Sequence, residues 1–128
     1  MKTKFLLIII ALSLLSNIKA QSYNDLWKNL NENLENNLPK SAVTILDEIE
    51  QKAVKENNQK ELLKTFLYRF KIFYLENDDA VEASIKFAEE NISRLQEPER
   101  AIFNLVIVSL YEDCQQLIAN SQQPTANG

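Results

Sequence analysis

The sequence predicts an all-α domain of about five helices, arranged as antiparallel hairpins in a bundle or a short solenoid. Apolar residues recur three or four positions apart over long stretches, which is the spacing of an amphipathic helix. Short polar breaks separate these stretches, and the expected helix starts lie roughly 20 residues apart. The only glycine is Gly128, the last residue, and such a composition favours helices over sheets.

The first two helices are expected at residues 22–36 and 39–56. Ser22 and Asp25 have the spacing of a capping box at the start of the first helix. Two asparagines end it, and Pro39 suits the first turn of the second helix, where its missing N–H leaves no bond unmade. The apolar positions are Tyr23, Trp27, Leu30 and Leu34 in the first helix and Ala42, Ile45, Leu46, Ile49 and Ala53 in the second.

The third helix begins near residue 59 and is expected to be the central one. Its apolar face is wide, and a helix with such a face must contact neighbours on two sides. The fourth helix is expected to start near residue 78, after the cap-type residues Asp78 and Asp79. The apolar positions are Leu62, Leu63, Phe66, Leu67, Phe70, Phe73 and Tyr74 in the third helix and Val81, Ile85, Ala88, Ile92 and Leu95 in the fourth.

A fifth helix is expected from Pro98, whose flanking glutamates resemble an acidic first turn, to about Ile118. The β-branched run at 105–108 also fits a buried strand, although no other segment offers a partner strand. The helical domain then spans residues 21–119, and residues 120–128 lack periodicity and are expected to form a disordered tail. The expected buried stripe of the fifth helix is Ala101, Ile102, Leu105, Leu110 and Cys114.

Residues 1–20 have the pattern of a secretory signal peptide, cleaved between Ala20 and Gln21. Lys2 and Lys4 precede an apolar run at residues 5–15, and Ala20 supplies a small residue before the cut. The run would rise only about 16 Å as a helix, against a hydrocarbon core of ~30 Å. We therefore expect an exported protein, periplasmic or secreted, with no stable membrane insertion after cleavage.

The mature chain is acidic. The full chain has 14 Lys and Arg against 18 Asp and Glu, and removal of Lys2, Lys4 and Lys19 leaves 11 basic residues and a net charge of −7. The basic residues are interspersed among acids, so that no basic patch for a phosphate backbone is expected. Nucleic acid is therefore not expected as a partner.

Cys114 is the only cysteine, which rules out an internal disulfide. It lies in register with Leu110 and Leu117, so that packing in the core is the expected role. The alternative is an intermolecular bridge or a redox role.

The sequence offers little for catalysis. It contains no histidine, which excludes Ser-His-Asp and Cys-His nucleophiles and the common zinc sites. It has no internal glycine for a P-loop, a dinucleotide fingerprint or a calcium hand. The carboxylate groups at Asp47-Glu48-Glu50, Asp78-Asp79-Glu82 and Glu89-Glu90 are expected on solvated helix faces rather than in a glycosidase or metal site. We expect no enzyme activity, cofactor or metal.

Three residues are candidate partner contacts: Trp27, Tyr68 and Arg69. Tryptophan, tyrosine and arginine dominate the energetics of protein interfaces, and Tyr68 and Arg69 lie on the aromatic third helix. For Trp27 the alternative is that it packs the first helix onto the second.

The hairpin spacing resembles that of tetratricopeptide arrays. Ala42-Val43 recurs as Ala80-Val81 at an offset of 38 residues. Trp27-x-x-Leu30 is similar to the opening of that family's signature, but Asn31 and Leu34 stand where the family has glycine and tyrosine. The likeness therefore concerns the geometry of the hairpins and not the family.

Several short motifs resemble the helical amino-terminal segment of large bacterial alpha-2-macroglobulin-like proteins. These are the signal ending in Ala-Gln, Tyr23-x-x-Leu26-Trp27, Leu38-Pro39-Lys40-Ser41-Ala42, Ile49-x-x-Lys52-Ala53 and Leu63-Lys64-x-x-Leu67-Tyr68-Arg69. The resemblance covers roughly residues 1–112. Cys114-Gln115-Gln116 lacks the glycines and the glutamate of that family's thioester, so that no reactive thioester is expected. The resemblance implies a truncated piece of such a protease inhibitor, without inhibitory activity.

Together these observations predict an exported, non-enzymatic helical module that docks onto another protein or a downstream domain. The alternative is a self-contained tetratricopeptide-like periplasmic module that binds peptides or proteins. A docking module should expose an apolar patch, whereas a peptide receptor should carry a polar groove lined by asparagine or lysine. The oligomeric state stays open.

Overall fold

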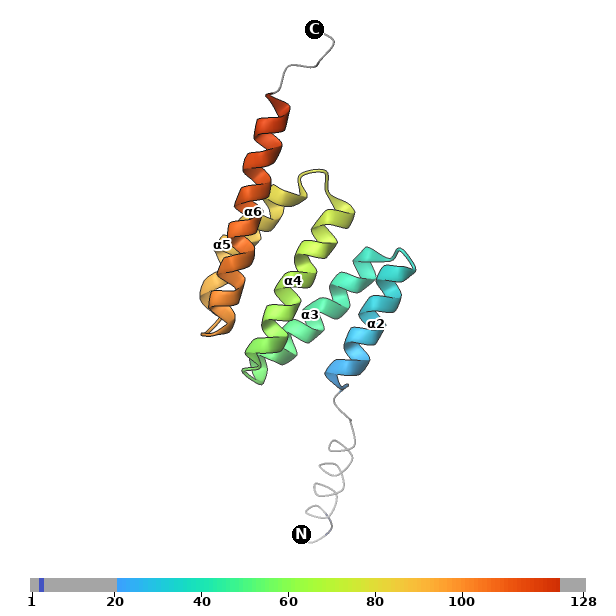
Figure 1. Cartoon of the computed structure of the whole chain (residues 1–128). Coiled ribbons are helices and arrows are strands. Elements are labelled where there is room, and N and C mark those ends of the chain that lie inside the picture. The colour runs from blue at the N-terminus through green and yellow to red at the C-terminus, as the bar shows by residue number, and fades with distance from the viewer. Residues whose placement is uncertain (1–2, 4–20, 123–128) are drawn as a thin grey trace.

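The computed structural model describes residues 21–122 together with Thr3, and over this range the protein is all-α, as predicted (Figure 1). The rest of the predicted signal peptide and residues 123–128 of the predicted tail lie outside the described residues. The elements are α2 (Tyr23–Glu35), α3 (Pro39–Lys55), α4 (Gln59–Glu76), α5 (Ala80–Asn91), the short 3-10 helix η1 (Ile92–Arg94) and α6 (Glu99–Ser121).

The predicted starts of the first three helices are confirmed, and side chains cap two of them. The Ser22 hydroxyl oxygen accepts a hydrogen bond from the Asp25 backbone N–H at 3.2 Å and caps α2. The Asn58 side chain accepts from the Glu61 backbone N–H at 3.2 Å and caps α4. Pro39 occupies the first turn of α3.

The turns after α2 and α3 have the same backbone conformation, in which one asparagine adopts left-handed backbone dihedral angles. Asn37 and Asn57 have φ values of 57° and 51°, and asparagine tolerates this region better than most residues. In each turn three successive backbone N–H groups donate to helix carbonyls, and the last of them are Leu38 to Asn33 at 2.8 Å and Asn58 to Ala53 at 2.8 Å. Asn37 and Asn57 thus occupy the left-handed position at which glycine is usual after a helix.

The helices form two layers and pack sequentially against their neighbours. In Figure 1, α2, α4 and α6 lie toward the viewer, and α3 and α5 lie behind them. Each helix packs against the next one along the chain, and α4 also packs against α6.

Two core clusters meet at α4. The aromatic cluster joins α4 to α5 and α6 and includes Ala53 of α3, and the Trp27 cluster joins α2 and α3 to α4 through Ile72. Because α4 contributes to both, the prediction of a central third helix is confirmed. The buried members of the aromatic cluster are Ala53, Leu62, Leu63, Phe66, Phe70, Ala88, Leu95, Phe103, Ile107 and Leu110. Those of the Trp27 cluster are Leu26, Trp27, Leu30, Ala42, Leu46, Ile49 and Ile72.

The fourth predicted helix is shorter than expected. It ends at Asn91, and Leu95 follows η1 in an extended conformation, yet Leu95 is fully buried in the aromatic cluster. The Asn91 side chain donates to the Phe87 carbonyl at 2.8 Å, a local bond of the kind that competes with helix continuation. Asp79, one of the two predicted cap-type residues, is the N-cap residue of α5, but its side chain makes no capping hydrogen bond.

The buried stripe predicted for the last helix is largely wrong. The buried side chains of α6 are Phe103, Ile107 and Leu110 with Glu99, whereas Ala101, Ile102 and Leu105 are exposed. Residues 105–108 are helical, so the strand alternative is also wrong. Sequence spacing misjudged this helix because it is apolar on two opposite sides.

The ends of α6 also differ from the prediction. Pro98 is the N-cap residue rather than a member of the first turn, and the helix runs three residues beyond Ile118, to Ser121. Cys114 is only partly buried and Leu117 is exposed, so the thiol lies at the margin of the core rather than within it.

Candidate interaction surface

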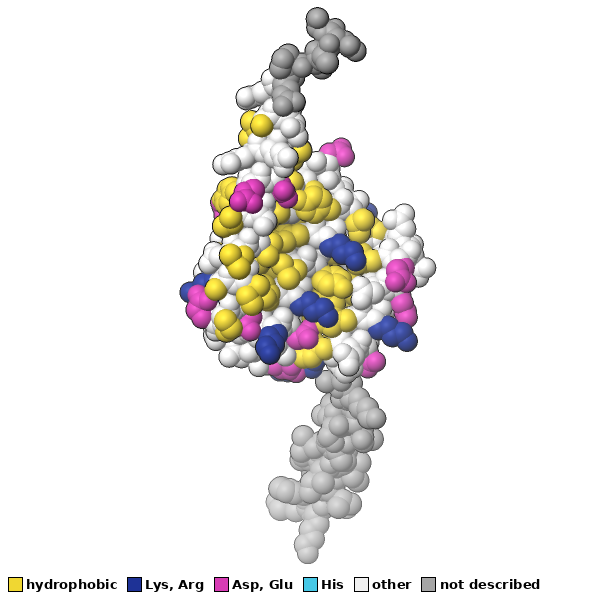
Figure 2. Space-filling model, in the orientation of Figure 1, with side chains coloured by type: hydrophobic (Ala, Val, Ile, Leu, Met, Phe, Trp, Pro, Cys, Tyr) yellow, Lys and Arg dark blue, Asp and Glu magenta, His cyan; other side chains and the backbone are white. Residues whose placement is uncertain are grey.

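The most unusual feature of the surface is the outer α6 face, formed by Ala101, Ile102, Leu105 and Val108. Leu105 is 71% exposed, Val108 54% and Ile102 48%. Successive helical residues are about 100° apart, which places Leu105 opposite the buried Phe103. No other helix covers this side of α6 in the described part of the chain. Figure 2 shows hydrophobic side chains along α6.

The opposite end of the array is different in character. The outward positions of α2 include Asn24, Lys28, Asn29 and Glu32, all exposed and polar. Lys28 and Glu32 are one helical turn apart, with 4.0 Å between Nζ and Oε1. The first helix therefore presents a hydrophilic end to solvent, and the last helix presents an apolar one.

Trp27 and Tyr68, two of the predicted contact residues, lie against each other where α2 meets α4. Their ring centroids are 4.7 Å apart. The Trp27 indole N–H donates to Glu61 at 2.5 Å, and the Tyr68 hydroxyl donates to Asn31 at 3.2 Å. Trp27 is only 5% exposed, so it packs in the core, and its main aromatic partner is on α4.

Arg69, the third predicted contact residue, joins α4 to α3. Its guanidinium pairs with the carboxylates of Asp47 and Glu50, the latter at 2.9 Å. Burial opposes the charge, but the hydrogen bonds that Arg69 donates to the two carboxylates, together with their negative charges, outweigh burial and raise the pKa of Arg69 above its ordinary value. Glu50 also forms an ion pair with Arg94, with 2.7 Å between the guanidinium nitrogen and the carboxylate oxygen.

This ion-pair network corrects the expectation that Asp47, Glu48 and Glu50 form a solvated face. Glu48 is exposed, but the Glu50 side chain is only 16% exposed and lies between two arginines. The apolar stripe of α3 gave the right core positions. Asp47 and Glu50, which flank this stripe, face α4 rather than solvent, because Arg69 on α4 supplies a cation for both carboxylates.

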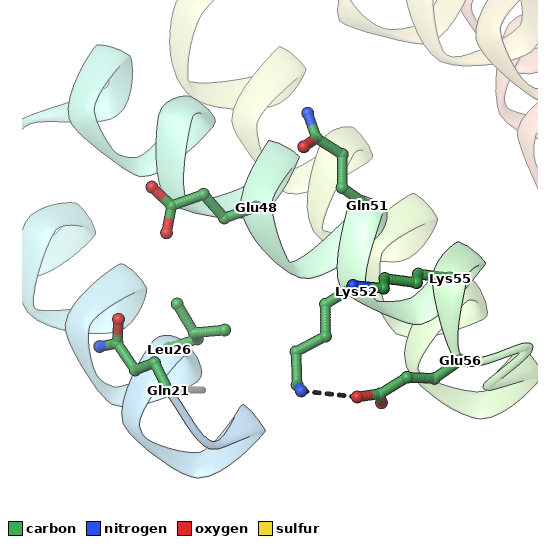
Figure 3. A pocket seen from close by; sticks show the side chains of 7 residues that line it. All are labelled: Gln21, Leu26, Glu48, Gln51, Lys52, Lys55 and Glu56. Carbon is green, nitrogen blue, oxygen red and sulfur yellow. Dashed lines mark hydrogen bonds and ion pairs between the residues drawn. The ribbon is translucent and has the colours of Figure 1, made fainter. Parts of the chain in front are cut away.

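Polar and charged residues supply most of the side chains that line the cleft between the start of α2 and the end of α3 (Figure 3). Lys52 donates to Glu56 at 2.7 Å, and the Tyr23 hydroxyl donates to Glu56 at 2.6 Å. Burial, together with this bond, raises the pKa of Tyr23 to about 12. Lys52 and Glu56 of the cleft are thus already paired with each other. Its lining residues are Gln21, Leu26, Glu48, Gln51, Lys52, Lys55 and Glu56.

Two further observations concern metals and membranes. Within residues 21–122, no group of three His, Cys, Asp or Glu side chains is placed to hold a metal ion. None of the described helices has the length and hydropathy needed to cross a bilayer.

The structure thus brings Trp27 and Tyr68 together and directs Arg69 toward α3. The outer α6 face is the surface that sequence reasoning missed, since Ala101, Ile102 and Leu105 were expected in the buried stripe and Val108 belonged to the run that also fitted a buried strand. Phe103, Ile107 and Leu110 have the spacing of a helical stripe, but Ala101, Leu105 and Val108 on the opposite side have the same spacing, so that the sequence carried no signal to distinguish the buried side. Comparisons with family models, curated proteins and solved structures found no match to the chain.

Proposed function

We propose that the mature chain is an exported, non-enzymatic helical module that docks onto another protein or a following domain through the outer α6 face. The observation that carries this proposal is the exposure of Ile102, Leu105 and Val108 on the last helix of the array. In stacked helical arrays a terminal element needs a polar outer face to stay soluble. The first helix meets this requirement, and the last does not.

The free energy available from covering the outer α6 face favours a partner in the same polypeptide, or a partner whose surface extends beyond this face. Full burial of a Leu, Ile or Val side chain stabilises by about 1.5–3 kcal/mol, and these three are roughly half exposed. Covering them would then contribute about 3 kcal/mol. Association of separate molecules costs at least ~4 kcal/mol in lost freedom, whereas a linked domain avoids most of that loss.

The sequence supports the other parts of the proposal. The charged start and apolar run of residues 1–20 support export, and protein sequencing of the secreted or periplasmic product should give Gln21 as the first residue. The absence of histidine supports a non-enzymatic role. The motifs that resemble the amino-terminal segment of alpha-2-macroglobulin-like proteins support interdomain docking, because large chains of that kind place further domains after such a segment.

A matched pair of valines allows a clean test. Val108 on α6 and Val54 on α3 are 54% and 53% exposed, so that Val108→Glu and Val54→Glu change the same chemistry on different faces. We expect the parent protein to bind an apolar fluorescent dye and to associate weakly in sedimentation velocity at high concentration. Val108→Glu should reduce both signals, and Val54→Glu should leave both near the parent values. Equal effects of the two variants would refute docking through α6.

The second candidate function is a tetratricopeptide-like module that binds peptides. It is favoured by the arrangement of α2, α4 and α6 in one layer, with a face of α4 between its two neighbours (Figure 1). Such a module would bind through the α4 face and would be indifferent to Val108→Glu.

A further inference from the structure

The solvent-facing side of α4 carries a row of three lysines: Lys60, Lys64 and Lys71. All three side chains are exposed. Their spacing of four and seven residues keeps them on one side of a helix with 3.6 residues per turn. At 1.5 Å per residue, the row extends about 16 Å along the helix. The face seen in Figure 2 carries separate basic side chains beside a broad hydrophobic area.

Two of these lysines are held by aromatic rings rather than by carboxylates. The Lys64 Nζ lies 4.1 Å from the Trp27 ring centroid, and the Lys71 Nζ lies 5.5 Å from that of Tyr68. In the described part of the chain, none of the three ammonium groups has a carboxylate within ion-pair distance. Their positive charges are therefore positioned by the fold without a paired carboxylate, and the Glu61 carboxylate at the Trp27 ring is hydrogen-bonded to the indole N–H.

Apolar side chains lie on the same side of α4. Leu67 and Tyr68 are half-buried between Lys64 and Lys71, and Leu75 is exposed one turn beyond Lys71. A ligand on this face would therefore meet alternating cationic and apolar groups. Such a surface complements carboxylates that are separated by apolar residues.

We propose that the lysine row binds an acidic segment of another protein, with apolar side chains between its carboxylates. The mature chain carries a net charge of −7, so most of its surface is unfavourable for an acidic segment, whereas the three lysines of the row lie together on one side of α4. This binding surface is separate from the outer α6 face and does not depend on docking there.

Trp27 provides a built-in reporter of this surface. It is the only tryptophan in the chain, and Lys64 lies over its ring. A carboxylate that draws the Lys64 ammonium away changes the electrostatic environment of the indole. Binding on the lysine row should therefore alter the fluorescence of Trp27, whereas binding on α6 should not.

The probe is a synthetic helical peptide with glutamates spaced by four and seven residues and leucines on the same side. We expect saturable binding by anisotropy of the labelled peptide, with a matching change in Trp27 emission. Because the contacts are ionic, affinity should fall as salt concentration rises. A peptide in which lysine replaces each glutamate should not bind.

Two charge-matched variants test the site. Lys64→Glu with Lys71→Glu should weaken binding by about tenfold or more, since each exposed ion pair adds up to ~1 kcal/mol. Lys40→Glu with Lys86→Glu makes the same change in net charge at exposed lysines of α3 and α5 and should have little effect. Equal losses in the two double variants, or no binding of the acidic peptide, would overturn the proposal. Val108→Glu should leave peptide binding unchanged, which separates this result from the test of α6.

Discussion

Replacement of Phe66 by alanine should remove a large share of the stability of the protein. Phe66 on α4 is fully buried, and its ring centroid lies 5.4 Å from that of Phe87 and 5.5 Å from that of Phe103. The substitution therefore leaves a cavity among three helices that their other contacts hold in place. Phenylalanine-to-alanine changes in such cores cost about 3–5 kcal/mol, against a typical total of ~5–15 kcal/mol.

Urea unfolding followed by circular dichroism measures this loss directly. Thermal melting gives a second measure, since 1 kcal/mol shifts the midpoint of a domain of this size by about 4–8 °C. Phe73→Ala is the matched control, because Phe73 is on the same helix but only half-buried, and its loss should be clearly smaller. Phe66→Asp should unfold the domain, because an unpaired charge would be buried. A loss below about 1 kcal/mol for Phe66→Ala would refute the assignment of α4 as the central helix.

Three other predictions follow from side-chain contacts. Arg69→Met should lower the free energy of unfolding in urea by about 1–3 kcal/mol, because Asp47 and Glu50 lose their shared cation. A loss no greater than that caused by Lys28→Met, at an exposed ion pair, would contradict this. Folding raises the Tyr23 pKa from 10.0 to about 12. The contribution of the protonated Tyr23 hydroxyl to the free energy of unfolding should therefore be complete below pH 10 and be lost as the pH rises to 12. A Tyr23→Phe variant with an unchanged stability profile over that range would exclude this. Cys114→Ser should leave the sedimentation coefficient unchanged, since the partly buried thiol is not expected to bridge two chains; a dimer lost in this variant would show the opposite.

The sequence predicted the helices better than it predicted their environment. The asparagine pairs and Pro39 are local signals, because capping and left-handed turns depend on a few adjacent residues. These signals placed the first three helices within one residue of the observed bounds, where bounds were predicted. Glu50 was misjudged because its arginine partners come from other elements of the chain. Spacing along one helix carries no information about such contacts.

The last helix shows a second limit of sequence reasoning. An amphipathic pattern identifies the buried side only when the other side is polar. In α6, Phe103 and Leu105 point in opposite directions and both are apolar, so that the pattern supports either choice. Only the position of α4 and α5 decides that Phe103 is inside and Leu105 is outside.

The place of α4 in both core clusters has a consequence for how the chain folds. The α2–α3 hairpin lacks Ile72 until α4 is in place, and the helices that follow lack Phe66 and Phe70. Neither part completes its core without α4, so folding should occur as one cooperative step rather than hairpin by hairpin. The main contacts join helices that are adjacent in the sequence, and proteins with such local topology fold within microseconds to milliseconds.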